Sequence, residues 1–330
     1  MNNILPLVRN EVMKIWKKKR FFVVLLLLLV MIPIFTYAQY KLATNIQEQM
    51  GTTDWKLSAQ EQVQDYTNRI NSPRMLEEWK TYYKIEVERL QYHIDNNVDP
   101  RSPNGVTFTR VFLENSIGLL LPLLVLVIVS DLVSSEFQQG TIKILVTRPV
   151  KRWKVLTSKF IALTFYVSLT VFSLVIMAYL ISGAIFGYGG FDAPVFMGFQ
   201  QVGSSIDTNG AYVVEQWQFL WMSMGLAWFS SMVVGCLALM VSILIRSTAA
   251  GMGVMVSTLI AGTILANMAA SWESAKYFFM INLNTIVFLS GQKPPVPGMD
   301  LSFSLINLSL TGLAAIIVSY AVFTKQDIYN

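Results

Sequence analysis

The sequence predicts an all-α polytopic membrane protein, with six transmembrane helices and an external helical hairpin between helices 1 and 2. Three observations lead to this prediction. Of the 330 residues, 54% are hydrophobic and only 14% are charged, whereas a soluble domain carries roughly 25% charged residues. Six apolar runs reach the length of about 20 residues that crosses a bilayer. Basic residues gather in the segments on one side of those runs.

The six apolar runs cover residues 21–40, 111–130, 155–186, 217–245, 249–270 and 302–323. The second run is the weakest, because Glu114 and Asn115 lie near its outer end. Pro33 and Pro122 fall inside runs, where neighbouring helices can tolerate a kink. A signal peptide is the alternative for the first run, which follows KKKR. Its charged region is long and its apolar run exceeds a typical signal core, so we expect an uncleaved helix.

Both termini are predicted to lie in the cytoplasm. Each side is counted together with the charged residues in the adjoining ends of the runs. The inner segments, which include residues 1–20, 131–154 and the tail 324–330, then hold 14 basic and 4 acidic residues. The outer segments hold 11 basic and 16 acidic residues. The clusters RNEVMKIWKKKR and TRPVKRWK both stay inside with this orientation, as the positive-inside rule requires. We therefore expect a multi-pass protein of the cytoplasmic membrane.

Residues 1–20 predict a basic amphipathic helix lying in the inner membrane interface. Apolar residues fall near one helical face and basic residues lie elsewhere; they are Ile4, Val8, Val12 and Ile15 or Trp16, against Arg9, Lys14 and Lys17. Such a helix with a tryptophan suits the headgroup region. A simple positive-inside anchor is the alternative interpretation.

The largest outer segment, residues 41–110, predicts a helical hairpin. Ser58 to Glu61 has the form of a capping box, and Ser72-Pro73 reads as the start of a second helix. After it, apolar side chains recur at steps of three and four, at Leu76, Trp79, Tyr83, Val87, Leu90 and Ile94. The hairpin is either a self-packed spacer or a docking surface. The other outer segments are residues 187–216 and 271–301.

Signatures of an enzyme are mostly absent from the sequence. It has no Gly-x-x-x-x-Gly-Lys-Ser/Thr phosphate loop, one histidine (His93) and one cysteine (Cys236). No ionisable residue was recognised at the centre of a span, which argues against proton coupling. We therefore expect no cofactor in this chain. A transporter of this kind must take its energy from a partner or act as a passive conduit.

The segment SSEFQQGTIKILVTRPVKRWKVLTSKF, residues 134–160, interrupts the apolar sequence with polar and basic residues. A short helix over 131–145 would begin with the acidic residues Asp131 and Glu136, which a helix start favours. Gly140 allows a bend or a close backbone approach, and Pro149 stops the helix. Such a helix could be a rigid lever between the second and third spans. A basic loop held at anionic headgroups is the alternative.

This segment resembles the loop after the second span of ABC exporter permeases of the ABC-2 type. The matching residues are Glu136, Gly140, Thr141, Leu145, Pro149, Arg152 and Lys159. The six spans and the basic N-terminal helix are also similar to that family, whereas the long insert 41–110 departs from its shorter members. The resemblance implies a permease that pairs with a second permease, as a homodimer or a heterodimer, and with two ABC ATPase subunits. ATP and Mg would bind in the ATPases, and Glu136, Gly140, Thr141, Leu145, Pro149 and Arg152 would form the ATPase-coupling loop.

Small residues recur every four positions in the fifth run, at Gly253, Ser257 and Ala261. Such spacing lets helices approach closely in lipid. The stripe packs either inside one bundle or, as the resemblance favours, against a second permease. Together these patterns predict the permease subunit of an ATP-driven exporter of an amphipathic cargo (a peptide, lipid or drug). A membrane sensor that uses the hairpin, and a membrane enzyme or ion-coupled carrier, are the alternatives.

Overall fold

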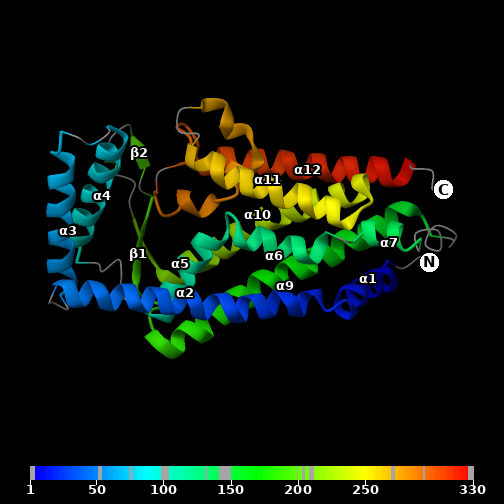
Figure 1. The fold of residues 1–330 in the computed structure, drawn as a ribbon, viewed down its shortest axis with the longest axis horizontal. Helices are drawn as coiled ribbons and strands as arrows, with labels where there is room; N and C mark the ends of the chain where they lie inside the picture. The colour runs from blue at the N-terminus through cyan, green and yellow to red at the C-terminus, as the bar shows by residue number, and fades with distance from the viewer. Residues whose placement is uncertain are drawn as a thin grey trace.

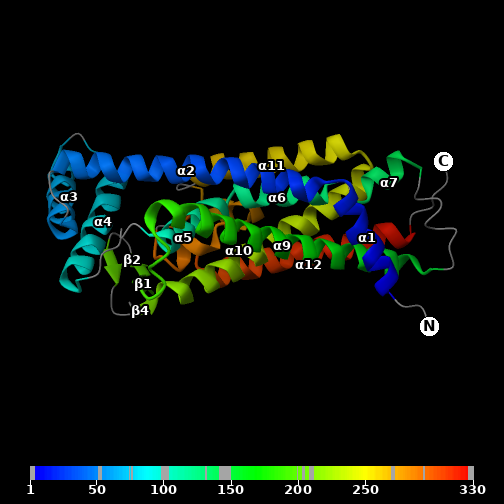
Figure 2. The same cartoon turned by 90° about the horizontal axis from the view of Figure 1, so that it is seen from below.

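The computed structural model describes residues 4–50, 54–73, 75, 77–97, 104–130, 132–140, 150–198, 200–202, 205–207, 212–268, 272–292 and 294–325. Its long helices lie side by side in a bundle, and a helical hairpin stands beyond one end (Figure 1). The start of α1 and the end of α12 lie at the other end (Figure 2). We call these the hairpin end and the α7 end.

Six helices are long and apolar enough to cross a membrane, as the sequence predicted. Five of them each lie within one helix: α2 (Arg20–Met50), α9 (Arg152–Phe186), α10 (Gln216–Ile245), α11 (Thr248–Met268) and α12 (Leu301–Lys325). Of the most apolar stretch of the second candidate span, in α6 and α7, 76% of the residues are buried. The corresponding stretches of α11 and α12 are each 22% buried. The second span therefore lies inside the bundle, and the last two lie at its edge.

The N-terminal part of the chain forms α1 (Leu5–Lys17) and α2 (Arg20–Met50). The two helices are separated at Lys19, whose φ of 55° is left-handed and ends the first helix. On α1, Glu11 and Ile15 are buried, whereas Leu5, Met13 and Trp16 are exposed. The helix thus turns a charged side chain inward and apolar side chains outward, which is an arrangement suited to lipid.

The second apolar run is two helices, not the single helix that residues 111–130 predicted. They are α5 (Gly105–Ser116) and α6 (Leu120–Val129). Asn104 starts α5, because its side chain accepts a hydrogen bond from the Thr107 backbone N–H. The break falls at Ile117–Leu119, and the candidate span covers Leu120–Gln138. α5, which carries Glu114, therefore precedes that span.

The hairpin consists of α3 (Trp55–Ile70) and α4 (Glu77–Asp95). Asp54 caps α3 by accepting a hydrogen bond from the Lys56 N–H, so the helix begins before the predicted Ser58. Residues 187–216 contain strands, where only a loop was expected. β1 (Pro194–Met197) pairs with β4 (Tyr212–Glu215), and β2 (Gln200–Val202) pairs with β3 (Ser205–Asp207), both antiparallel. The Phe196 ring lies 4.8 Å from that of Tyr92, which joins β1 to the hairpin.

Between α11 and α12 the chain forms three short 3-10 helices, η2 (Glu273–Tyr277), η3 (Phe279–Asn282) and η4 (Thr285–Phe288). The Ser230 hydroxyl donates to the Leu283 carbonyl at 3.0 Å. Ser230 is the fifteenth of the 30 residues in α10. The non-helical segment therefore reaches down to the middle of α10. Irregular backbone at that depth requires partners within the protein, and Ser230 supplies one.

Candidate functional site

The helix α7 (Ser134–Gln138) is five residues long and connects the second span to the segment before α9. Its first three residues, Ser134, Ser135 and Glu136, are buried. Gln138, Gln139 and Gly140 are exposed. The helix therefore has an inner face fixed to the bundle and an exposed C-terminal end.

Four charged side chains from three helices form a buried cluster, which we call the four-charge cluster: Glu11, Lys14, Glu136 and Lys159. The Lys159 Nζ donates to Glu11 Oε2, to Glu136 Oε1 and to the Leu132 carbonyl, each at 2.8 Å. The Lys14 Nζ donates to Glu11 Oε1 at 2.9 Å and to Glu136 Oε1 at 2.7 Å. All three N–H groups of the fully buried Lys159 are thus used.

The cluster is electrically balanced, with two ammonium and two carboxylate groups. Burial opposes ionisation of Glu11, but the charges and hydrogen bonds of Lys159 and Lys14 outweigh it and lower the Glu11 pKa below its ordinary value. Burial acts against the charge of Lys14 as well, yet Glu11 and Glu136 raise its pKa. A buried ion pair adds little net stability, but losing one partner costs about 3–5 kcal/mol. The cluster therefore fixes α1, α7 and α9 in one arrangement.

Further contacts tie α7 to the remaining helices of the same end. The Ser134 N–H donates to the Ser242 hydroxyl of α10 at 2.9 Å. The Ser134 hydroxyl lies 2.8 Å from the hydroxyl of Thr248, the first residue of α11. The Lys18 Nζ donates to the Ser135 hydroxyl at 2.9 Å. The Arg246 guanidinium lies 5.0 Å from the centre of the Phe137 ring. We call α7 with these contacts the α7 joint.

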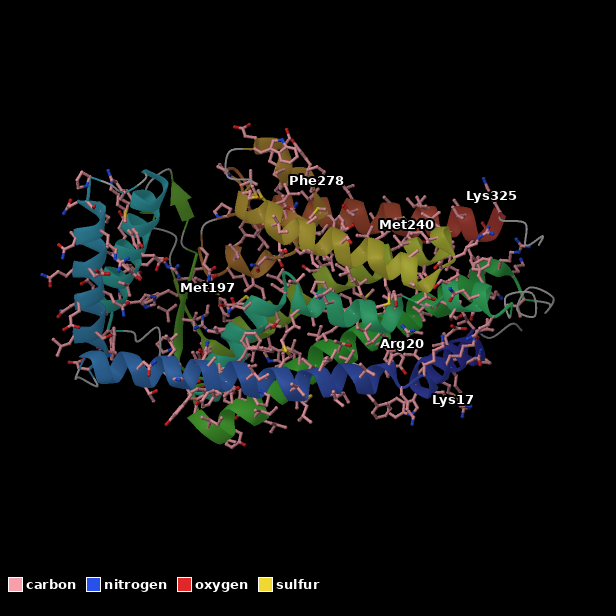
Figure 3. The ribbon with its side chains drawn as sticks, in the orientation of Figure 1. Lys17, Arg20, Met197, Met240, Phe278 and Lys325 are labelled. Atoms are coloured by element: carbon pink, nitrogen blue, oxygen red, sulfur yellow. The ribbon has the colours of Figure 1, made fainter. Side chains whose placement is uncertain are left out.

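The turn between α1 and α2 is fixed at the same end. The Arg20 Nη1 donates to the Val127 carbonyl at 2.9 Å and to the Ser130 hydroxyl at 3.2 Å, so α2 is bound to the end of α6. Figure 3 shows Arg20 against α6 and Lys17 on the outer side of α1. A displacement of α7 would therefore be transmitted to α1, α9, α10 and α11 directly and to α2 through the turn.

Comparison with known proteins places the chain in a family. Residues 81–329 match the family described as "Protein of unknown function (DUF2705)". The chain belongs to the DUF2705 family. Two proteins of Bacillus subtilis (strain 168) are similar to it. The uncharacterized protein YhcI is 26% identical over 328 residues, which are 99% of this chain and 100% of YhcI. The uncharacterized membrane protein YdbK is 29% identical over 218 residues, 64% of this chain and 80% of YdbK.

The match to the DUF2705 family covers the α7 joint only in part. It includes α7 and α9, whereas α1 lies before residue 81. The similarity to YhcI extends over almost the whole chain and so includes α1. With six candidate spans, this DUF2705 protein has the architecture of a multi-pass membrane protein.

The predicted coupling residues occupy three different environments. Glu136 is 5% exposed and faces the bundle, so it binds Lys14 and Lys159 of its own chain. Gly140 has a φ of +67°, and an added Cβ would meet no atom of the described residues within 4 Å. Its conformation, and not a close backbone approach, requires a glycine there. The Arg152 Nη1 donates to the Thr324 carbonyl at 3.3 Å. Thr141, Leu145 and Pro149, like Asp131, lie outside the described residues.

The stripe Gly253, Ser257 and Ala261 lies on the exposed side of α11. An added Cβ at Gly253 would meet nothing within 4 Å. On the opposite side of the same helix, Met255 and Leu259 are buried against the bundle. The stripe is therefore not covered by the described part of the chain.

Sequence reasoning missed Glu11, Lys14 and Lys159 as partners of Glu136. Lys159 lies inside the apolar run 155–186, near its inner end, and the sequence alone does not indicate a partner for it. An isolated lysine in such a run, and a single acidic residue in the basic segment 1–20, were the available signals. Among the described residues, no group of three or more His, Cys, Asp or Glu side chains could hold a metal ion.

Proposed function

We propose that this DUF2705 protein is the permease subunit of an ATP-driven exporter of the ABC-2 type, which its α7 loop resembles. The α7 end faces the cytoplasm, and the hairpin end faces outward. Two such permeases pair and bind two ABC ATPase subunits, which hold ATP and Mg. The cargo is amphipathic and crosses the cytoplasmic membrane.

The α7 joint is the observation on which this proposal rests. An ATPase that closes on ATP can move a permease only through a rigid element that it contacts. The Glu136 side chain joins α7 to α1 and α9 at 2.7 and 2.8 Å, and Ser134 joins it to α10 and α11. A push on α7 would therefore shift several helices together, because closely packed elements move as bodies.

The exposed end of α7 is the surface that we assign to the ATPase. Gln139 is exposed, whereas Glu136 is used inside the chain. This assignment changes the role expected for Glu136, which fixes the lever and leaves the contact to its exposed neighbours. The left-handed Gly140 ends the lever.

The exposed stripe on α11 supports pairing with a second permease. Gly253, Ser257 and Ala261 offer a smooth helix face on which another helix can pack closely. A neighbouring copy of this chain or a related permease would cover it. This contact would hold the two α7 joints at a fixed separation.

The test is co-purification with an ABC ATPase encoded beside this chain, measured together with ATP hydrolysis. Gln139→Arg should weaken the complex at least tenfold, because it adds a long charged side chain to the assigned contact. Gln64→Arg, at an exposed position of α3, is the matched control and should bind normally. Normal binding by Gln139→Arg, or ATP hydrolysis by this chain alone, would refute the proposal. A protein with no ATPase partner would favour the sensor alternative.

Cysteine labelling tests the orientation. The single native cysteine, Cys236, is buried, which gives a clean background. Gln60→Cys should react with an impermeant thiol reagent added to intact cells, and Gln139→Cys should react only after the membrane is opened. The reverse pattern would place the α7 joint outside, where no ATPase can reach it.

A further inference from the structure

A second polar cluster lies at the hairpin end, in the upper part of the bundle. Among the described residues, the buried side-chain atoms without a hydrogen-bond partner there include Arg110 Nε, Glu114 Oε1, Ser223 Oγ and Asn284 Oδ1. Buried polar atoms in folded proteins are nearly always paired with protein, water or a ligand. We call these four residues the hairpin-end site.

Arg110 and Glu114 lie one turn apart on α5. The closest approach of their charged groups, from Arg110 Nη1 to Glu114 Oε1, is 3.6 Å, which is too long for a hydrogen bond. The Arg110 guanidinium lies 5.4 Å from the centre of the Phe219 ring of α10. The pair is therefore attracted electrostatically, but each group keeps hydrogen-bonding capacity for a third party.

Ser223 of α10 and Asn284, just before η4, come from elements that pack near the ends of this pair's helix. Ser223 follows Phe219 by four residues, so it lies one turn below it on the same face of α10. Glu114 precedes Gly118 by four residues, and a Cβ at Gly118 would lie 4.0 Å from Asn284 Cβ. The 3-10 segment thus brings Asn284 to the break between α5 and α6. Figure 1 shows α5, α10 and this segment at the end of the bundle that faces the hairpin, to the right of α3 and α4.

Arg89 of α4 lies above the site. Its Nη2 donates to the Ser290 carbonyl at 3.3 Å, and its Nη1 lies 3.3 Å from Glu86 Oε1. The charge of Arg89 also acts on both Arg110 and Glu114. The hairpin therefore adds a second cation near the site, and Glu86 is a carboxylate neighbour of that cation.

Among the described residues named here, positive and negative charges are equal in number. Arg89 and Arg110 carry two positive charges, and Glu86 and Glu114 carry two negative charges. Burial raises the Glu114 pKa, and the nearby charges of Arg110 and Arg89 only partly oppose it. A buried ion of one sign would add an uncompensated charge to this balance, which is costly. A molecule that carries both signs would not.

We propose that the hairpin-end site binds a zwitterionic head group, with its anionic group on Arg110 and its ammonium group on Glu114 and Asn284. Arg110 offers an N–H fork suited to phosphate or carboxylate oxygens. Glu114 Oε1, Asn284 Oδ1 and Ser223 Oγ offer three acceptors for the three N–H groups of a primary ammonium. The binding does not depend on the exporter function, although it would give the head-group chemistry of the cargo if that function holds.

The probes are glycerophosphoethanolamine, glycerol phosphate and ethanolamine, added to the purified full chain in detergent. Titration calorimetry should give saturable binding of the zwitterion and at least tenfold weaker binding of the two single-charge probes. Arg110→Gln and Glu114→Gln should each weaken zwitterion binding at least tenfold. Asp65→Asn is the matched control, because Asp65 and Arg69 form an exposed ion pair with the same four-residue spacing; it should bind as the parent does.

Two sources can supply such a head group, and vesicles distinguish them. Stronger binding to the free probe than to phosphatidylethanolamine vesicles identifies a soluble ligand, and the reverse identifies a lipid. Ser223→Ala keeps the proposal testable should both charge variants fail to fold, because it should weaken zwitterion binding several-fold in a folded protein. Absence of saturable binding to both sources, or equal affinity for glycerol phosphate, would overturn the proposal and leave water as the occupant. ATPase co-purification is unaffected by either result, so the exporter proposal fails or stands separately.

Discussion

The two ends of the bundle each bring together two carboxylates and two cations, yet they differ in how these groups are bonded. In the four-charge cluster the ion pairs measure 2.7–2.9 Å, and every Lys159 N–H has an acceptor. At the hairpin end, Arg110 and Glu114 approach only to 3.6 Å, and atoms of both have no hydrogen bond. In the four-charge cluster the two carboxylates are joined by short bonds to both lysines, and only Glu136 Oε2 is among the buried atoms without a hydrogen bond. The more completely bonded cluster holds helices in place, whereas the less completely bonded one retains affinity for another molecule.

The positions of the two clusters agree with this difference. The bonded cluster lies where α1, α7 and α9 must move as one body in the proposed mechanism. The incompletely bonded cluster lies next to the hairpin. Contacts such as Arg89 with Ser290 and Tyr92 with Phe196 fasten the hairpin to the rest of the chain. The following predictions test this comparison, beginning with the largest effect.

Replacing Lys159 with methionine should lower the free energy of unfolding by about 3–5 kcal/mol, because two buried carboxylates then share only Lys14. The equivalent change at the other end, Arg110→Met, should cost less, since Glu114 has no hydrogen bond to Arg110 to lose. Chemical unfolding of the detergent-solubilised protein measures both. Adding Glu136→Gln to Lys159→Met should restore part of the loss. Equal costs at the two ends would contradict the distinction between them.

The fold was largely predictable, because span length and hydropathy depend on local composition. The six spans and the hairpin follow from such local patterns, and so does the contrast between the polar and basic residues 134–160 and their apolar neighbours. The bonds of Lys159 do not follow from local patterns. Its partner Glu136 is 23 positions away in the sequence, and its partner Glu11 is 148 positions away. The break between α5 and α6 was also hidden, since the apolar residues Ile117 and Leu119–Leu121 continue across it. The strands in residues 187–216 are short and pair only in three dimensions.

The two ends should also respond to pH with opposite signs. The Glu11 pKa is lowered, so its stabilising contribution is complete above its ordinary value of 4.5 and is lost as pH falls through the lowered folded-state pKa. The Glu114 pKa is raised, so its contribution is complete below 4.5 and is lost as pH rises through the raised folded-state pKa.

Unfolding midpoints measured from acid to neutral pH check this contrast in two variants. Glu11→Gln should weaken the protein at neutral pH and reduce its loss of stability in acid. Glu114→Gln should leave neutral-pH stability unchanged or raised, because it removes a buried charge with no hydrogen bond to its partner. A large destabilisation by Glu114→Gln at neutral pH would show that Glu114 is bonded as tightly as Glu11.

Two glycines give a smaller contrast of opposite signs. Gly140→Ala should destabilise the fold by about 1 kcal/mol, because a Cβ is strained at a left-handed φ. Gly253→Ala should stabilise the isolated chain by about 0.5–1 kcal/mol, because alanine suits the interior of α11 better than glycine does. The same Gly253→Ala should weaken pairing of two permeases, which cross-linking in membranes measures. Unchanged pairing would show that the stripe faces lipid.

The smallest effect concerns two serines on one face of α10. Ser223 and Ser230 are both fully buried, but of the two only Ser230 has a hydrogen-bond partner among the described residues, since it donates to the Leu283 carbonyl at 3.0 Å. Ser230→Ala should cost about 1 kcal/mol, because that carbonyl then loses its donor at mid-depth in the bundle. Ser223→Ala should change the unfolding free energy by less than about 0.5 kcal/mol in ligand-free protein, since the Ser223 hydroxyl makes no hydrogen bond there. Added glycerophosphoethanolamine should separate them again, stabilising Ser230→Ala as it does the parent and stabilising Ser223→Ala less. Equal costs for the two serines without ligand would mean that the Ser223 hydroxyl is already bonded, and the hairpin-end site would then lose one of its acceptors.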